Sequence, residues 1–82
     1  MASISRDLHD RCIAAFAAIK ARDPDLAAQA LARGVPLTIG SPAHALMQDL
    51  LALDAVASAF ATGVRPRAAQ MKRALALTEV RA

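Results

Sequence analysis

Few side chains in this sequence have the types and spacing that chemistry requires. His9 and Cys12 are three residues apart, so on a helix they would share a face and could offer two ligands to a metal ion. Folding could add Asp10 or His44, but a structural zinc site needs four ligands, and the sequence does not offer four good ones. Cys12 also falls within an apolar stripe, where a thiol behaves as a small hydrophobe. We therefore predict a packing role for Cys12 and no metal site.

His44 is the other candidate for chemistry, as a base that would act with Cys12 or Asp49. No nucleophile-elbow motif, phosphate-binding loop or pair of carboxylates accompanies it, and the three glycines are isolated from one another. A helical chain of 82 residues also has little volume for a substrate pocket of several hundred cubic ångström. The sequence thus predicts no enzyme, no catalytic residue, no cofactor and no small-molecule substrate.

Helix-start and helix-stop signals divide the chain. Ser3 or Ser5 can cap a first helix, and a capping residue followed by proline starts two more, at Asp23-Pro24 and Ser41-Pro42. Gly34 falls where a left-handed C-terminal cap of the second helix would lie, and Gly63 ends the third. The predicted helices are about 4–21, 24–33, 42–62 and 66–80. We expect one all-α domain over residues 1–82, a compact bundle of four helices.

The segment between the second and third predicted helices is irregular. It covers residues 34–41 and contains three branched apolar residues, Val35, Leu37 and Ile39, with Pro36 and Gly40 among them. Prolines and glycine at this spacing prevent a helix. We expect the apolar side chains of this connector to pack over the core, or one strand of it to pair with the sheet edge of a partner.

The pattern of apolar residues predicts more apolar helical surface than a small bundle needs. Ile13 and Phe16 widen the apolar stripe of the first helix, and helix 42–62 is apolar over more than half of its circumference. Such a helix is either central in its fold or packed on two partners. Domains of this size are also marginally stable alone. We therefore expect self-association, as a homodimer, or binding to another protein.

Charge is distributed unevenly along the chain, whose formal net charge is +3. Residues 64–82 carry five basic groups against one acidic group, whereas residues 1–63 carry five against six. A basic terminal helix can lie on phosphates, so the alternative function is a dimeric DNA-binding regulator. Its nucleic-acid contacts would come from the basic C-terminal helix: Arg65, Arg67, Lys72 and Arg73.

Cysteine usage and segment lengths bear on location. A lone cysteine cannot form an internal disulfide, the N-terminus lacks the pattern of a signal peptide, and the longest uncharged stretch, 35–48, is broken by proline and glycine. We expect a cytoplasmic protein and no membrane partner.

The function that these patterns favour is a small non-catalytic protein-interaction module: an adaptor, regulator or inhibitor that binds a larger protein or itself through apolar helical surface. The predicted partner contacts are apolar residues of helix 42–62 together with two arginines that steer an acidic partner. They are Met47, Leu53, Phe60, Arg67 and Arg73.

Overall fold

A computed structural model describes residues 4–79 of the chain. Its secondary structure is four helices, which confirms the predicted all-α bundle: α1 (Arg6–Arg22), α2 (Pro24–Leu31), α3 (Pro42–Thr62) and α4 (Ala68–Thr78). The predicted caps form. Side-chain oxygens of Ser5, Asp23 and Ser41 each accept a hydrogen bond from the backbone N–H three residues later, at 3.1, 3.3 and 3.2 Å. Local capping therefore sets where three of the helices begin.

Several helix ends differ from the sequence prediction by one or two residues, and two of them have local reasons. The helix α2 ends at Leu31 rather than at 33, because Ala32 turns to extended backbone. Gly34 does adopt a left-handed φ of +74°, but beyond the helix. The helix α4 begins at Ala68 rather than at 66, because the Gln70 side-chain oxygen accepts a hydrogen bond from the Arg67 N–H (3.3 Å) and caps the helix there. Ser3 and the predicted end at residue 80 lie outside the described residues.

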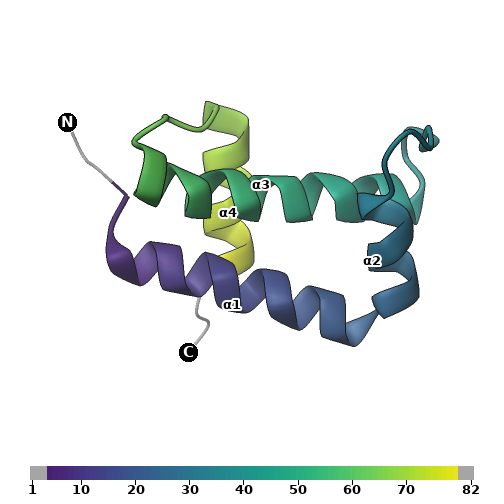
Figure 1. The fold of residues 1–82 in the computed structure, drawn as a ribbon, viewed down its shortest axis with the longest axis horizontal. Helices are drawn as coiled ribbons and strands as arrows, with labels where there is room; N and C mark the ends of the chain where they lie inside the picture. Colours follow the sequence, from purple (N-terminus) through teal and green to yellow (C-terminus); the bar gives the residue numbers. More distant parts are fainter. Residues whose placement is uncertain (1–3, 80–82) are drawn as a thin grey trace.

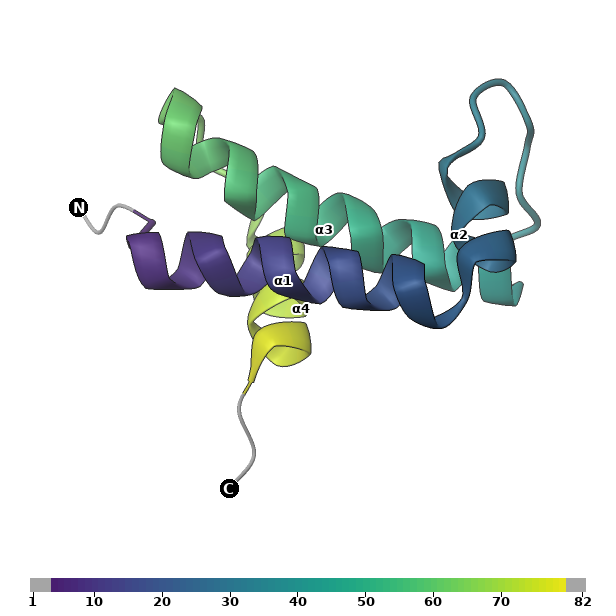
Figure 2. The same cartoon turned by 60° about the horizontal axis from the view of Figure 1, so that its bottom comes forward.

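The helices α1 and α3 lie side by side along the length of the molecule, and α4 crosses behind both of them (Figures 1 and 2). The short α2 connects the end of α1 to the start of α3 and also contacts both. Arg11 ties α4 to α1, since its guanidinium donates to the Thr78 carbonyl oxygen (3.3 Å). Successive side chains of an α-helix are rotated by 100° about its axis, so Arg11 and Ile13, two residues apart, project from nearly opposite sides of α1. Because Arg11 faces α4, Ile13 faces the side that α4 leaves uncovered.

The helix α3 is the centre of this arrangement because each of the other three helices packs against it. Its residues Leu50, Leu53 and Val56 have no exposed surface, and Cys12 of α1 is equally buried beside them. The wide apolar stripe of α3 is therefore used in part inside one chain. A central position in the fold was one of the two arrangements that the apolar pattern of α3 allowed.

The connector between α2 and α3 corrects one expectation. Val35 is 56% exposed and Ile39 is 86% exposed, so these side chains do not pack over the core, and only Leu37 is half-buried. The segment projects from the bundle as a loop (Figure 2). It follows the short helix α2, which is only eight residues long.

The helix α3 is also the one helix in residues 4–79 that is long and apolar enough to cross a membrane by length and composition. It has 21 residues and includes Asp49 and Asp54. A core helix of a globular protein meets the same criterion, and the contacts of α3 with three helices give its apolar residues another use.

Replacing Leu50 by alanine should lower the free energy of unfolding by about 2–5 kcal/mol, since it leaves a cavity where α3 meets its neighbours. Ile39→Ala is the matched control, because that side chain is exposed and its loss should change stability by less than about 0.5 kcal/mol. Urea unfolding followed by circular dichroism measures both. Equal losses in the two variants would contradict this description of the core.

Candidate protein-binding groove

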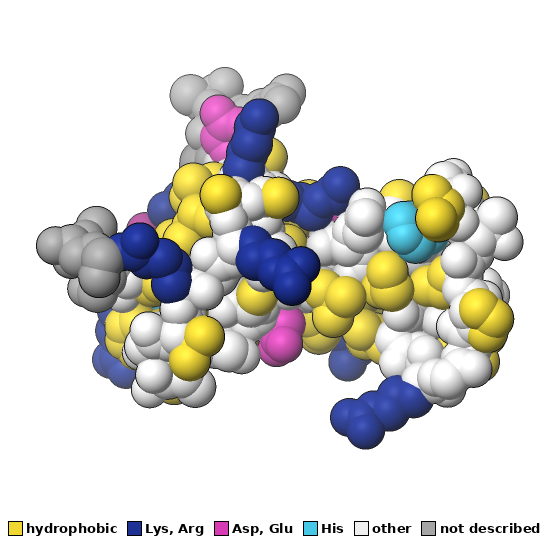
Figure 3. Space-filling model, turned by 90° about the horizontal axis from the view of Figure 1, so that it is seen from above, with side chains coloured by type: hydrophobic (Ala, Val, Ile, Leu, Met, Phe, Trp, Pro, Cys, Tyr) yellow, Lys and Arg dark blue, Asp and Glu magenta, His cyan; other side chains and the backbone are white. Residues whose placement is uncertain are grey.

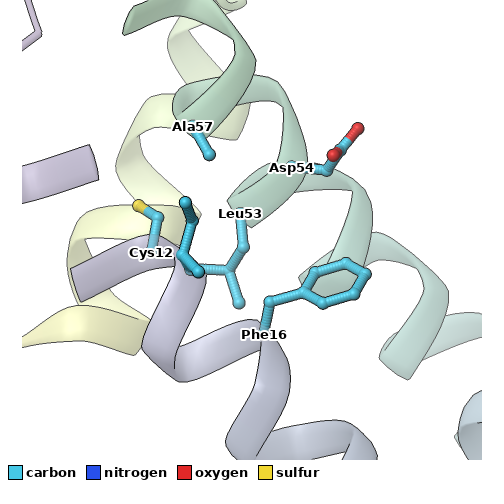
Figure 4. Close-up of a pocket in the computed structure, with 6 residues that line it drawn as sticks. Cys12, Phe16, Leu53, Asp54 and Ala57 are labelled. Carbon is cyan, nitrogen blue, oxygen red and sulfur yellow. The ribbon is translucent and has the colours of Figure 1, made fainter. Parts of the chain in front are cut away.

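A shallow groove runs between α1 and α3 on the side that α4 leaves uncovered. It deepens into an opening of about 120 Å³, which we call the apolar pocket. None of its lining residues comes from α4. In Figure 4 the apolar side chains converge on this opening, while the Asp54 carboxylate points away from them. The lining residues are Cys12, Ile13, Phe16, Leu53, Asp54 and Ala57.

Aromatic rings covered by cations mark this face of the molecule. The Lys20 ammonium lies 5.7 Å from the centroid of the Phe16 ring. The Arg6 guanidinium lies 5.9 Å from the centroid of Phe60, whose ring also stacks against His9 at 4.6 Å between centroids. The side chains of Arg6 and Lys20 lie across the faces of these rings, and their charged ends remain in solvent. The groove is therefore apolar at its floor and positively charged along its α1 edge.

A second hollow lies where the end of α3 meets the turn into α4. It has a volume of about 320 Å³, and we call it the arginine pocket. Asp54 is the one residue that lines both pockets, and the other α3 residues of the two pockets lie on different faces of the helix. The polar residues that line the arginine pocket come from α3, from the turn that follows it and from the first turn of α4. They are Asp54, Ser58, Thr62, Arg65, Arg67 and Gln70.

The predicted partner contacts fall into different environments. Phe60 is 38% exposed, Met47 is half-buried against the core, and Arg67 is exposed in the arginine pocket. Leu53 has no exposed surface, so its role is in the core and in the floor of the apolar pocket. Arg73 forms an ion pair with Asp49 and also donates to Gln48, which joins α4 to α3. Leu53 is therefore no surface contact, whereas Arg73, whose side chain is 41% exposed beside Asp49, stays a predicted contact.

The alternative set of nucleic-acid contacts is not one basic surface. Arg73 is held by Asp49, and Arg65 and Arg67 lie in the turn before α4 and at its N-cap rather than on its exposed face. Lys72 is thus the one cation of the helix itself that is exposed without an acidic partner within residues 4–79. On the face drawn in Figure 3, Lys and Arg side chains are scattered among hydrophobic ones. This arrangement lacks the basic stripe that a phosphate backbone favours.

The residues that could do chemistry are engaged in packing and local bonds. Cys12 is fully buried, and burial raises the pKa of its thiol, an effect that the nearby Arg11 charge opposes. His9 stacks on Phe60 and its Nδ1 lies 2.9 Å from the Asp10 carboxylate. Within residues 4–79, no three His, Cys, Asp or Glu side chains gather as metal ligands would.

Sequence reasoning missed most residues of the groove. Ile13 and Phe16 were recognised as residues that widen the apolar stripe of the first helix, and this widened stripe was the available signal. Which part of that stripe remains open depends on where α4 crosses, and no local pattern encodes that position. Asp54 gave no signal, since a lone carboxylate on a helix is ordinary surface.

No family model, curated protein or solved structure matches this chain. The function must therefore be argued from the groove itself.

The buried thiol makes stability depend on pH. In the unfolded chain Cys12 ionises near its ordinary pKa of 9.0, whereas burial raises that pKa in the fold. Ionisation thus favours the unfolded state, so stability is complete below about pH 9 and falls as the pH rises further. Urea midpoints measured on both sides of pH 9 should show this loss in the natural chain and less of it in Cys12→Ala. An identical pH dependence in the two proteins would contradict the assignment.

Proposed function

We propose that this protein is a non-catalytic protein-interaction module, an adaptor, regulator or inhibitor, that binds one helix of a partner protein in the groove between α1 and α3. The observation that carries the proposal is the apolar pocket, which a single chain leaves open beside half-exposed aromatic rings. A helix presents apolar side chains at spacings of three and four residues and can lie along such a groove.

The size of the apolar pocket indicates what it accepts. Its volume of about 120 Å³ is well below the roughly 300–1,000 Å³ of pockets that enclose drug-sized ligands. It is close to the ~150 Å³ cavity that admits a benzene-sized group. One leucine, methionine or phenylalanine side chain of a partner suits this volume, and a metabolite-sized substrate does not.

Charge favours an acidic partner over a second copy of the chain. Arg6 and Lys20 lie over the rings of Phe60 and Phe16 beside the groove, and Asp54 is the acidic residue that lines its pocket. Two copies meeting through this face would bring like charges together, which costs free energy at an interface. The main reason to expect a homodimer, the wide apolar stripe of α3, is met in part by contacts within one chain, which bury Leu50, Leu53 and Val56 and leave Leu51 46% exposed. The occupant we propose is an amphipathic helix of another protein with acidic residues beside its apolar ones.

A pocket-filling variant tests the proposal without knowledge of the natural partner. Display of randomised amphipathic helices about 15 residues long, with apolar residues at i, i+3 and i+7, should enrich sequences that bind the natural chain. Ala57→Met fills the apolar pocket from its wall and should weaken the enriched peptides at least about tenfold, the cost of losing one buried anchor. Ala14→Met, on an exposed position outside the pocket, is the matched control and should leave affinity unchanged.

Three results would overturn the proposed function. One is a selection in which helices with apolar residues at i, i+3 and i+7 are enriched no more than helices with polar residues at the same positions. The second is enriched peptides that bind Ala57→Met as well as the natural chain. The third is a tight homodimer in solution that loses its self-association in Ala57→Met, since the groove would then belong to a second copy.

Light scattering after size exclusion distinguishes the nucleic-acid alternative. We expect no change in mass when random-sequence duplex DNA is added at low salt, because the exposed cations are scattered over several elements. A DNA complex that dissociates at high salt and is absent when Arg65, Arg67, Lys72 and Arg73 are replaced by glutamine would instead favour a DNA-binding regulator.

A further inference from the structure

Phe60 lies outside the apolar pocket but on the same side of its helix. On α3, Leu53, Ala57 and Phe60 follow one another at spacings of four and three residues, which align them along one face. On α1, His9 precedes Ile13 by four residues and shares its face. The groove between α1 and α3 therefore continues from the apolar pocket toward Phe60 and His9, which are in contact with each other.

The rings of Phe60 and His9 form a surface at this end of the groove, which we call the aromatic platform. Their centroids lie 4.6 Å apart and their planes are inclined by 33°. The Arg6 guanidinium lies 5.9 Å from the Phe60 centroid and borders the platform. Phe60 nevertheless stays 38% exposed, so part of its ring remains open to a partner.

The platform follows the apolar pocket at a distance of about one helical turn. Ala57 of the pocket is three residues from Phe60 on α3, and Ile13 of the pocket is four residues from His9 on α1. These separations correspond to roughly 4.5–6 Å along the two helix axes. Side chains three or four positions apart on one face of a partner helix have the same spacing. One such side chain would reach the pocket while its neighbour reaches the platform.

The platform differs from the pocket in the chemistry that it offers. Aromatic rings attract one another edge to face or in offset stacks, at centroid distances of roughly 4.5–7 Å, and this attraction adds to the effect of buried area. A leucine of the partner would bury area against Phe60 and His9 without this addition. The platform therefore favours an aromatic side chain, whereas the pocket limits its occupant chiefly by volume.

We infer that the aromatic platform binds an aromatic side chain of the same partner helix whose apolar anchor fills the apolar pocket. The inference rests on the proposed function and adds a rule for the partner. Its helix carries an apolar anchor and, three or four residues before or after it, a phenylalanine, tyrosine or tryptophan. Two contacts of different chemistry, one turn apart, would also fix the register and direction of the bound helix.

The test uses pairs of the selected helical peptides that differ by one residue, Phe or Leu, one turn from the anchor and on each side of it in turn. The anchor is the residue whose replacement by alanine weakens binding to the natural chain but not to Ala57→Met. On one side of the anchor, the Phe peptide should bind the natural chain about fivefold more tightly than the Leu peptide. Phe60→Leu keeps an apolar side chain but removes the ring, so it should reduce this ratio to about one while binding of the Leu peptide changes less than about twofold.

Phe16→Leu is the matched control, because the chain has only two phenylalanines and Phe16 lines the pocket rather than the platform. It should weaken both peptides and keep the ratio between them. Circular dichroism and urea unfolding check that both variants keep the fold.

Nuclear Overhauser effects supply an independent readout of the same register. The chain contains no tyrosine or tryptophan, so the ring protons of its two phenylalanines can be assigned without overlap from other large aromatic residues. In the complex, the Phe60 ring should show contacts with the aromatic residue of the peptide, and the Ala57 methyl group should show contacts with the anchor. Absence of any contact between the Phe60 ring and the peptide would contradict the inference.

Each unfavourable outcome identifies what has failed. If Phe and Leu peptides bind alike on both sides of the anchor, or if the Phe preference persists in Phe60→Leu, the platform is overturned while the proposed function stands. If the preference disappears equally in Phe16→Leu, it does not belong to the platform, and the inference is likewise overturned. If no apolar helix binds at all, the proposed function itself has failed.

Discussion

The burial of α3 against three other helices is the constraint on which this structure depends. Leu50, Leu53 and Val56 are fully enclosed, and their burial requires α1, α2 and α4 to be present at the same time. Much of the remaining core is alanine, which allows close approach of helices but contributes little apolar area. A chain with one buried cysteine, no disulfide and few aromatic rings therefore relies on the enclosure of a single helix for its stability.

The same constraint creates the groove. Three helices surround α3 incompletely, and α4 crosses on one side of the α1–α3 pair, so the other side remains open (Figure 1). Because Ala57 is small, the floor there is not filled by α3 itself, and Ile13 and Phe16 of α1 are left half-covered. The alanine-rich core around α3 and the open apolar pocket both result from the same packing of the four helices. The stability of this protein is therefore linked to its proposed binding function.

Electrostatic interactions divide into two groups with different roles. Arg11 and Arg73 bond to groups across helices, to the Thr78 carbonyl and to Asp49, and so hold α4 in its place. Most other cations lack such partners among the described residues, because several acidic residues cap helices or pair elsewhere. Among these cations, Arg6 and Lys20 lie over the rings of Phe60 and Phe16, and Arg65 and Arg67 line the arginine pocket.

The sequence by itself determined the helices and their order, because caps, prolines and glycines act within a few residues of one another. It also located the apolar stripes. Tertiary structure alone decided which part of each stripe stays exposed. Periodicity shows which side of a helix is apolar, but the packing of the helices decides that Leu53 is enclosed while Ile13 stays 50% exposed. For the same reason the sequence did not reveal that Arg73 pairs with Asp49 or that the connector leaves Ile39 in solvent.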